Sequence, residues 1–186
     1  AGENLRGLFD VLSEEIIDRH LGDGWFSEHV DDSATSSQAR NYFYADGPAA
    51  ARLLAAHRSH ELARRLYQLQ SFPWFADVVK RIRTRDLSGA GFELDVVLLL
   101  HNLVARVTPR EETGQRGEDY DIHLNIYGLE VPVEVKAKVD DTPYTANTVI
   151  RTVKGAARQL PLGSTGIVVL RIPTAWVGRE LEETYA

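Results

Sequence analysis

The chain has 186 residues, of which 44% are hydrophobic, enough for one domain with a small appended unit. No run of about 18 apolar residues could span a membrane, so we expect no membrane partner. The chain has no cysteine, which excludes disulfides and thiolate metal sites, and no secretory signal, so we expect a cytoplasmic protein. It also has no methionine, even at position 1, which suggests a piece of a longer protein.

The net charge of −6 argues against non-specific coating of nucleic acid, but the charge is unevenly spread. Residues 1–46 carry 3 basic and 10 acidic side chains, whereas residues 47–90 carry 8 basic and 3 acidic ones. The acidic segment is a candidate surface for a protein partner. The basic block is either a phosphate-binding surface or an ordinary solvated helix face. Its densest cluster consists of Lys80, Arg81, Arg83 and Arg85.

The first half of the chain has apolar residues at helical spacing. This spacing predicts helices over residues 3–20, 47–70 and 73–85, with a loop rich in Gly, Asp and Ser over residues 22–38. Ser88 or the glycines at 89 and 91 are expected to end the third of these helices. A largely buried helix is then expected over residues 91–107.

The second half changes to alternating apolar and polar residues. Residues 120–128 and 130–138 predict a β-hairpin, followed by a helix over 145–161 and a strand over 165–173, buried on both faces. We therefore expect an α/β fold with a small mixed sheet, preceded by a helical N-terminal region. The expected division is a helical region over residues 1–71 and a second domain over residues 72–186.

The stretch "VPVEVKAK", residues 131–138, places charged residues between valines. Successive side chains of a strand point to opposite faces, so Glu134, Lys136 and Lys138 share one face. Two interpretations stay open at this point: an ordinary solvated face, or a functional cleft that receives Glu134 and Lys136.

A hairpin turn centred on Gly128 and Leu129 would pair residues whose numbers sum to 257. Asp121 then lies opposite Lys136, and His123 opposite Glu134, with all four on one face. Asp121 and Glu134 become diagonal neighbours at about 7 Å, close enough to share one cation, whereas Asp119 lies a further two residues away. Two carboxylates beside a lysine suit Mg²⁺ and the hydrolysis of a phosphate ester. The alternative is a cross-strand Asp–Lys salt bridge with Glu134 solvated.

Four stretches in this order resemble the PD-(D/E)xK nuclease superfamily, whose fold is called restriction endonuclease-like: "GFELDVVLLL", "GEDYDIHL", "VPVEVKAK" and "AARQL". The resemblance covers about residues 72–173 and follows the αβββαβ order of that family's core. It implies a metal-dependent endonuclease, a hydrolase of phosphodiester bonds, with DNA as the expected substrate.

The resemblance also implies roles for particular residues. Five match the family's catalytic positions: Glu93, Asp121, Glu134, Lys136 and Gln159. The expected ligands of Mg²⁺, or of Mn²⁺ in its place, are Glu93, Asp121, Glu134 and the Val135 carbonyl. Arg158 is expected to contact phosphate. The alternative function is an inactive module of the nuclease fold that binds nucleic acid or a protein partner.

Overall fold

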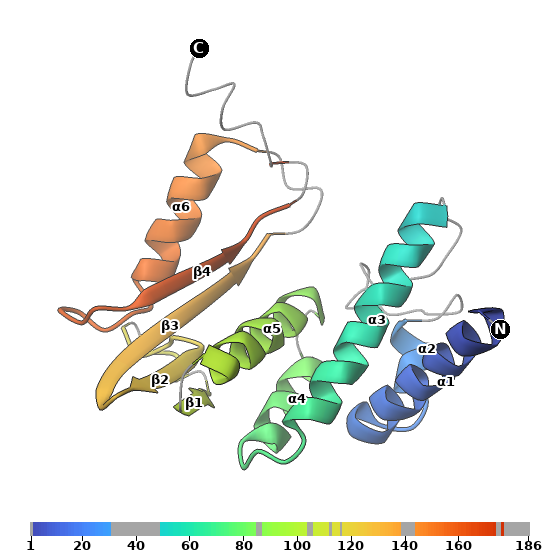
Figure 1. Ribbon diagram of the computed structural model, residues 1–186. Coiled ribbons are helices and arrows are strands. Elements are labelled where there is room, and N and C mark those ends of the chain that lie inside the picture. The colour runs from blue at the N-terminus through green and yellow to red at the C-terminus, as the bar shows by residue number, and fades with distance from the viewer. Residues whose placement is uncertain are drawn as a thin grey trace. The chain divides into compact units, whose positions relative to one another are not determined.

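The computed structural model describes residues 2–30, 49–84, 87–103, 106–111, 113–115, 117–138, 144–173 and 176. The chain folds into two compact units, residues 1–91 and 92–186. In the described residues the fold is mixed α/β, with six helices and a four-stranded mixed sheet (Figure 1). The expected domain boundary between residues 71 and 72 stays a prediction. Within these residues, no helix has both the length and the apolar character needed to cross a bilayer.

The first unit is helical. It contains α1 (Gly2–Leu21), α2 (Trp25–His29), α3 (Ala49–Leu69), α4 (Phe75–Thr84) and the first residues of α5. The predicted helices over residues 3–20, 47–70 and 73–85 therefore correspond to α1, α3 and α4. α1 packs against α3, and both contribute fully buried leucine or isoleucine side chains to the core of this unit.

Helix α2 lies inside the stretch that composition predicted to be a loop. Both carboxylate oxygens of Asp18 accept backbone N–H groups there, from Phe26 at 2.6 Å and from Gly24 at 3.1 Å. Trp25 and Phe26 are buried. Burial of two large aromatic side chains outweighs the loop-forming tendency of the neighbouring Gly and Asp residues.

Helix α5 (Leu87–Leu103) differs from its predicted bounds at both ends. Ser88, Gly89 and Gly91 lie inside the helix rather than breaking it. A glycine costs about 1 kcal/mol relative to alanine in a helix, and burial of an apolar stripe offsets that cost. The helix ends at Leu103, before the predicted residue 107. The β-branched residues that follow form strand β1 (Arg106–Pro109) instead.

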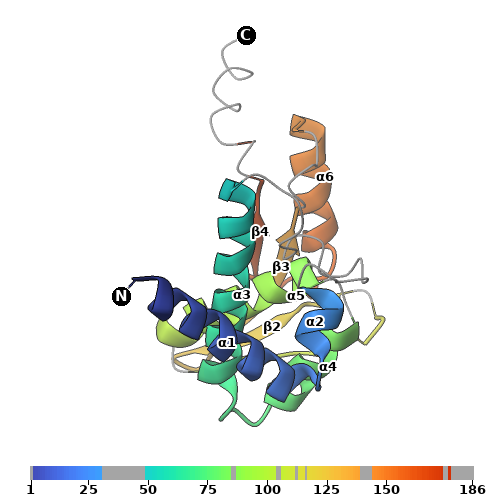
Figure 2. The same cartoon turned by 90° about the vertical axis from the view of Figure 1, so that its right-hand side faces the viewer.

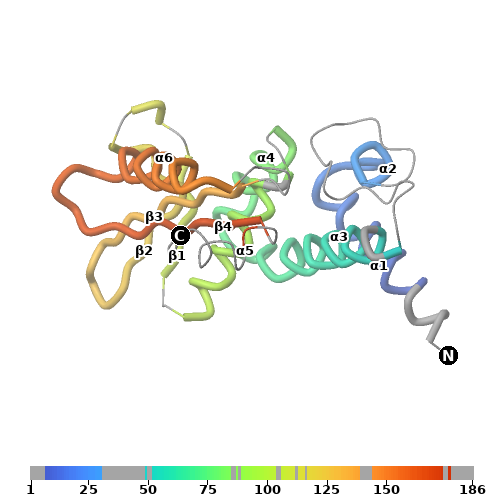
Figure 3. The backbone as a smooth tube through the Cα atoms, turned by 90° about the horizontal axis from the view of Figure 1, so that it is seen from above, coloured from blue at the N-terminus to red at the C-terminus, as the bar shows by residue number. Residues whose placement is uncertain are grey.

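The sheet belongs to the second unit and has the strand order β1-β2-β3-β4. Strands β2 (Ile122–Ile126) and β3 (Leu129–Ala137) form the predicted hairpin, and β1 pairs antiparallel with β2. Helix α6 (Ala146–Ala157) connects β3 to the parallel strand β4 (Ile167–Arg171) and packs on both of them. Figures 2 and 3 show α6 running beside these two strands.

The register of the hairpin differs from the prediction by two residues. The observed pairs, from Ile122 with Val133 to Ile126 with Leu129, have numbers that sum to 255 rather than 257. The turn is centred on Tyr127 and Gly128, which have φ values of 51° and 86°. Positive φ at both central positions is typical of a type I′ turn, whose twist matches that of the flanking strands.

Strand β4 was expected to be buried on both faces, and this is wrong. Ile167 is exposed, and the other four residues of the strand are half-buried. The strand lies at the edge of the sheet, and α6 is the helix that packs on it. Its apolar composition therefore goes with its parallel pairing to β3 and does not show that both of its faces are covered by other elements.

Candidate metal centre

The hairpin separates its side chains into an apolar and a polar face. Ile122, Leu124, Val133 and Val135 are buried on the apolar face. The polar face follows from the same alternation, because residues that are paired across strands share a face. It carries Asp121, His123 and Asn125 from the first strand and its entry, and Glu130, Glu134 and Lys136 from the second.

Asp121 and Glu134 are the buried acidic pair of this face. The register continued by one residue beyond Ile122 and Val133 places Asp121 directly opposite Glu134. The Oδ2 atom of Asp121 accepts the backbone N–H of Val135 at 2.7 Å, which fixes the carboxylate against β3. Asp121 is 8% exposed and Glu134 is 0% exposed. A pair that was expected to be diagonal is therefore brought face to face, with both carboxylates withdrawn from water.

The Glu134 carboxylate is poorly satisfied for a buried charge. In the described part of the chain, neither of its oxygens has a partner with hydrogen-bonding geometry, and its close contact is an ion pair with Lys136 Nζ. Burial raises the pKa of the Glu134 carboxyl, the nearby Lys136 ammonium partly offsets this, and the negative charge of Asp121 adds to the rise, so that the net pKa is about 7. A cation placed between the two carboxylates would offset both the free-energy cost of burying their charges and the repulsion between them.

The salt bridge between Asp121 and Lys136, which was the alternative to a metal site, is replaced by a different pair. With the observed register, Lys136 is no longer opposite Asp121, and its ammonium lies against Glu134 on its own strand. The side chain of Lys136 is 35% exposed, so the ammonium lies between the buried carboxylates and solvent. This is the position from which a lysine could meet a phosphate group.

Asp119, the alternative ligand, is used to close the loop before β2. Its Oδ1 accepts the backbone N–H groups of Thr113 at 2.6 Å and Gly114 at 3.1 Å. Gln159, which follows α6, donates from Nε2 to the Asp119 carbonyl at 3.4 Å. Gln159 thus contacts the backbone two residues before Asp121, and it holds the entry to β2 rather than reaching the carboxylates themselves.

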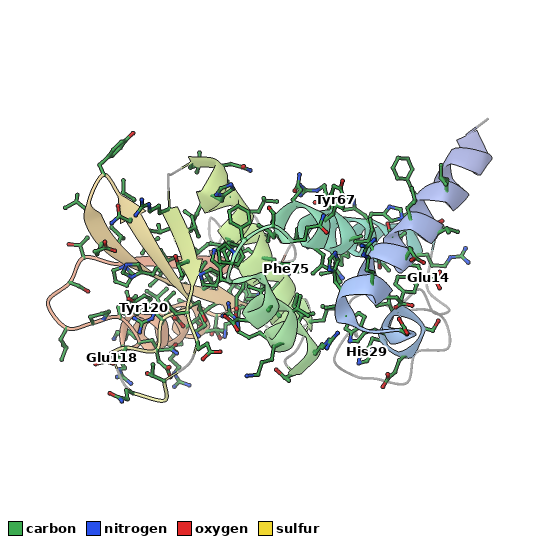
Figure 4. The ribbon with its side chains drawn as sticks, turned by 90° about the horizontal axis from the view of Figure 1, so that it is seen from below. Glu14, His29, Tyr67, Phe75, Glu118 and Tyr120 are labelled. Atoms are coloured by element: carbon green, nitrogen blue, oxygen red, sulfur yellow. The ribbon has the colours of Figure 1, made fainter. Side chains whose placement is uncertain are left out.

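His123 is engaged away from Glu134. Its Nδ1 lies 3.0 Å from the Tyr120 hydroxyl, and its Nε2 pairs with Glu130, which also accepts the Asn125 amide. The Arg110 guanidinium stacks on the Tyr120 ring, 4.4 Å from its centroid. Figure 4 labels Tyr120 and, in the loop before it, Glu118. Sequence alternation placed His123 on this face, but its partners depend on the register and could not be read from spacing.

Glu93 and Arg158 are the predicted residues that the structure does not bring into this cluster. Glu93 is half-buried on α5, whose Phe92 lies under the Arg171 guanidinium at 5.4 Å. Arg171 pairs with Ala137, one residue beyond Lys136, so the chain at Glu93 approaches that end of β3. Among the residues that the structure describes, no group of three or more His, Cys, Asp or Glu side chains is close enough to hold a metal ion. Arg158 is exposed at the end of α6.

The basic cluster lies on α4 in the first unit. Lys80 and Arg83 are exposed and Arg81 is half-buried, while Arg85 falls outside the described residues. Arg83 donates to the His20 carbonyl at 3.1 Å, so one of the cluster's guanidinium groups also ties α4 to α1.

In comparisons with known proteins, the chain matches no family model, no curated protein and no solved structure.

Proposed function

We propose that this protein is a metal-dependent nuclease of the PD-(D/E)xK type that hydrolyses phosphodiester bonds in DNA. The observation that carries the proposal is the acidic pair: Asp121 and Glu134 lie opposite each other, both buried, with Lys136 against Glu134. A solvated strand face, the competing interpretation, would leave these carboxylates in water. Here burial raises the pKa of Glu134 to about 7, an unfavourable arrangement that suits a site for a cation.

The donor set fits Mg²⁺ or Mn²⁺. Both ions prefer oxygen ligands, and Asp121, Glu134 and the Val135 carbonyl would supply them, with Glu93, which lies outside this cluster, contributing through water. The buried Glu134 carboxylate, whose close contact among the described residues is the Lys136 ion pair, is the structural support for this assignment. A bound divalent ion makes water a better nucleophile and stabilises charge on a phosphate oxygen.

Each residue of the proposed site then has a defined role. The Val135 N–H group holds Asp121 in place through Oδ2, so that Oδ1 would be the oxygen that holds the cation. With a cation bound, Glu134 has a second counter-charge, so the Lys136 ammonium can donate to the attacking water or to a phosphate oxygen. Gln159 keeps the backbone before Asp121 in position through the Asp119 carbonyl.

An inactive module of the same fold is the second candidate, and two observations favour it. Lys136 already neutralises Glu134, and three acidic side chains do not converge among the described residues. An ion pair of this kind can persist as a structural element after catalysis is lost.

A cleavage assay separates the two candidates. The full chain is incubated with linear, branched and single-stranded DNA, with RNA as a further substrate, in Mg²⁺, Mn²⁺ or EDTA. The nuclease proposal expects cleavage in the presence of either metal and none in EDTA. Binding of nucleic acid without cleavage of any of these substrates would favour the inactive module.

A further inference from the structure

We infer that the polar face of β1 and β2 is a binding path for the phosphodiester backbone, with Arg106 and Arg110 as its phosphate contacts. The inference rests on the proposed nuclease function and extends it to the strand that leads away from the acidic pair. The sequence had assigned phosphate binding to the α4 cluster and Arg158, none of which belongs to this strand.

The pairing of the strands places these arginines. Arg106 pairs with Asn125 and Thr108 with His123, and the Arg110 N–H donates to the Asp121 carbonyl at 2.8 Å, which continues the same register. Because paired residues share a face, Arg106, Thr108 and Arg110 lie on the face that carries Asp121. Arg110 is therefore the neighbour of Asp121 on the adjacent strand.

The exposure of this face increases with distance from the acidic pair. Glu134 is 0% exposed, the His123 side chain is 35% exposed, and Arg106 and Thr108 are exposed on the edge strand. The side chains of this face are thus buried at the carboxylates and exposed to solvent on β1. A long polyanion could reach the buried pair from this side, whereas a small ligand would not need an open strip.

The charges on this strip suit a phosphate chain. Arg106 and Arg110 are four residues apart on a strand, about 13 Å, which corresponds to roughly four base pairs of rise along the axis of a DNA duplex at about 3.4 Å each. The acidic residue nearest to Arg106 in its row is Glu130, and this carboxylate is occupied by His123 and Asn125. Arg110 stacks on the Tyr120 ring and its backbone pairs with that of Asp121, so this arginine lies next to the acidic pair along the sheet.

Binding is measured without cleavage, so that the inference is tested apart from catalysis. Fluorescence anisotropy follows a labelled DNA duplex in EDTA over a range of NaCl concentrations. Single-stranded DNA and duplex RNA serve as separate arms. Arg106→Ala removes one cation from the path, and Arg151→Ala is its matched control, because Arg151 is exposed on α6. Thr108→Lys adds a cation between the two arginines, and Asn147→Lys adds one at an exposed position of α6.

We expect Arg106→Ala to reduce the steepness of log K against log[salt] by about 0.9 and to weaken binding several-fold, while Arg151→Ala changes neither. Thr108→Lys should steepen the slope of log K against log[salt] by about 0.9, whereas Asn147→Lys should leave this slope unchanged. The proposed binding path would be rejected if each path variant changed binding no more than its α6 control. It would also be rejected if the wild type bound no nucleic acid. If the path variants behave as expected but the wild type cuts nothing in Mg²⁺ or Mn²⁺, the binding path stands and the nuclease proposal fails.

Discussion

Asp121 lies opposite Glu134 on the adjacent strand, and its negative charge adds to the effect of burial in raising the pKa of the Glu134 carboxyl to about 7. Two carboxylates held in this way destabilise each other unless a proton or a cation is present. The pair is therefore a source of measurable consequences for stability and for metal binding, as well as for catalysis.

Glu134→Gln should stabilise the metal-free protein at high pH. The pKa of Glu134 is about 7 in the folded state, above the ordinary value of 4.5. Between pH 4.5 and about pH 7 the folded state therefore keeps a proton on Glu134 that the unfolded state has lost. The stability associated with neutral Glu134 is full below pH 4.5 and is lost as the pH rises through about 7. Glutamine stays neutral throughout, so the variant should gain up to about 3 kcal/mol at pH 8, a figure that already includes the effect of Lys136 on the Glu134 pKa. Urea unfolding in EDTA at pH 5 and pH 8 measures this difference.

Glu130→Gln is the control for that experiment, because Glu130 lies on the same strand and face but is exposed. It should show no comparable gain between pH 5 and pH 8. A Glu134→Gln protein less stable than the wild type at pH 8 would contradict the unfavourable burial of this carboxylate.

Divalent cations should stabilise the wild type against heat. At a Mg²⁺ or Mn²⁺ concentration 100 times the Kd, binding contributes about 2.7 kcal/mol to the free energy of unfolding. The effect should be larger at pH 8 than at pH 6, because a proton competes with the cation for Glu134. Thermal melts of the wild type, Glu134→Gln, Asp121→Asn and Glu130→Gln test this; equal shifts in all four proteins would place the cation elsewhere.

Lys136→Ala should slow cleavage by about 10²–10³-fold while largely sparing the binding of metal, because it removes a positioned cation and no ligand. Lys138→Ala provides the matched control, since Lys138 lies two residues further along, on the same face. Single-turnover rates with saturating Mg²⁺ separate the two variants. Comparable losses in both would show a general effect of charge rather than a specific role for Lys136.

The α4 cluster should contribute to binding through counterion release. Replacement of Lys80, Arg81, Arg83 and Arg85 by alanine should weaken DNA binding and flatten its salt dependence. Because Arg83 also donates to the His20 carbonyl, the variant's folding is checked by circular dichroism. An unchanged salt slope would identify the cluster as an ordinary solvated helix face.

The alternation of the hairpin was sufficient to predict which residues share the polar face, although the predicted register was wrong. A shift of two residues preserves the faces, because the side-chain period of a strand is two. It does change the partners, and it moved Asp121 from Lys136 to Glu134. The turn centre was missed because Tyr127 adopts a φ of 51°, a conformation in which Gly, Asn or Asp is expected.

Other features depended on tertiary packing that sequence patterns do not reveal. Composition marked Gly89 and Gly91 as helix breakers, but they lie within a helix most of whose apolar residues are buried. Alternation puts Asp119 and Asp121 on one face, and their spacing from Glu134 favoured Asp121, but only the folded loop shows that Asp119 binds the Thr113 and Gly114 backbone. The position of Glu93 depends on where α5 begins and ends, and the predicted bounds of this helix were wrong at both ends.

The most direct test of the proposed site compares Mg²⁺-dependent cleavage of DNA by the wild type and by Glu134→Gln under single-turnover conditions. Glutamine keeps the size of the side chain and removes the charge that would hold the metal, and unfolding curves establish that the variant is folded. We predict cleavage by the wild type and a loss of more than about 10³-fold in the variant. Equal rates in the two proteins would contradict the assignment of Glu134 to a catalytic metal centre.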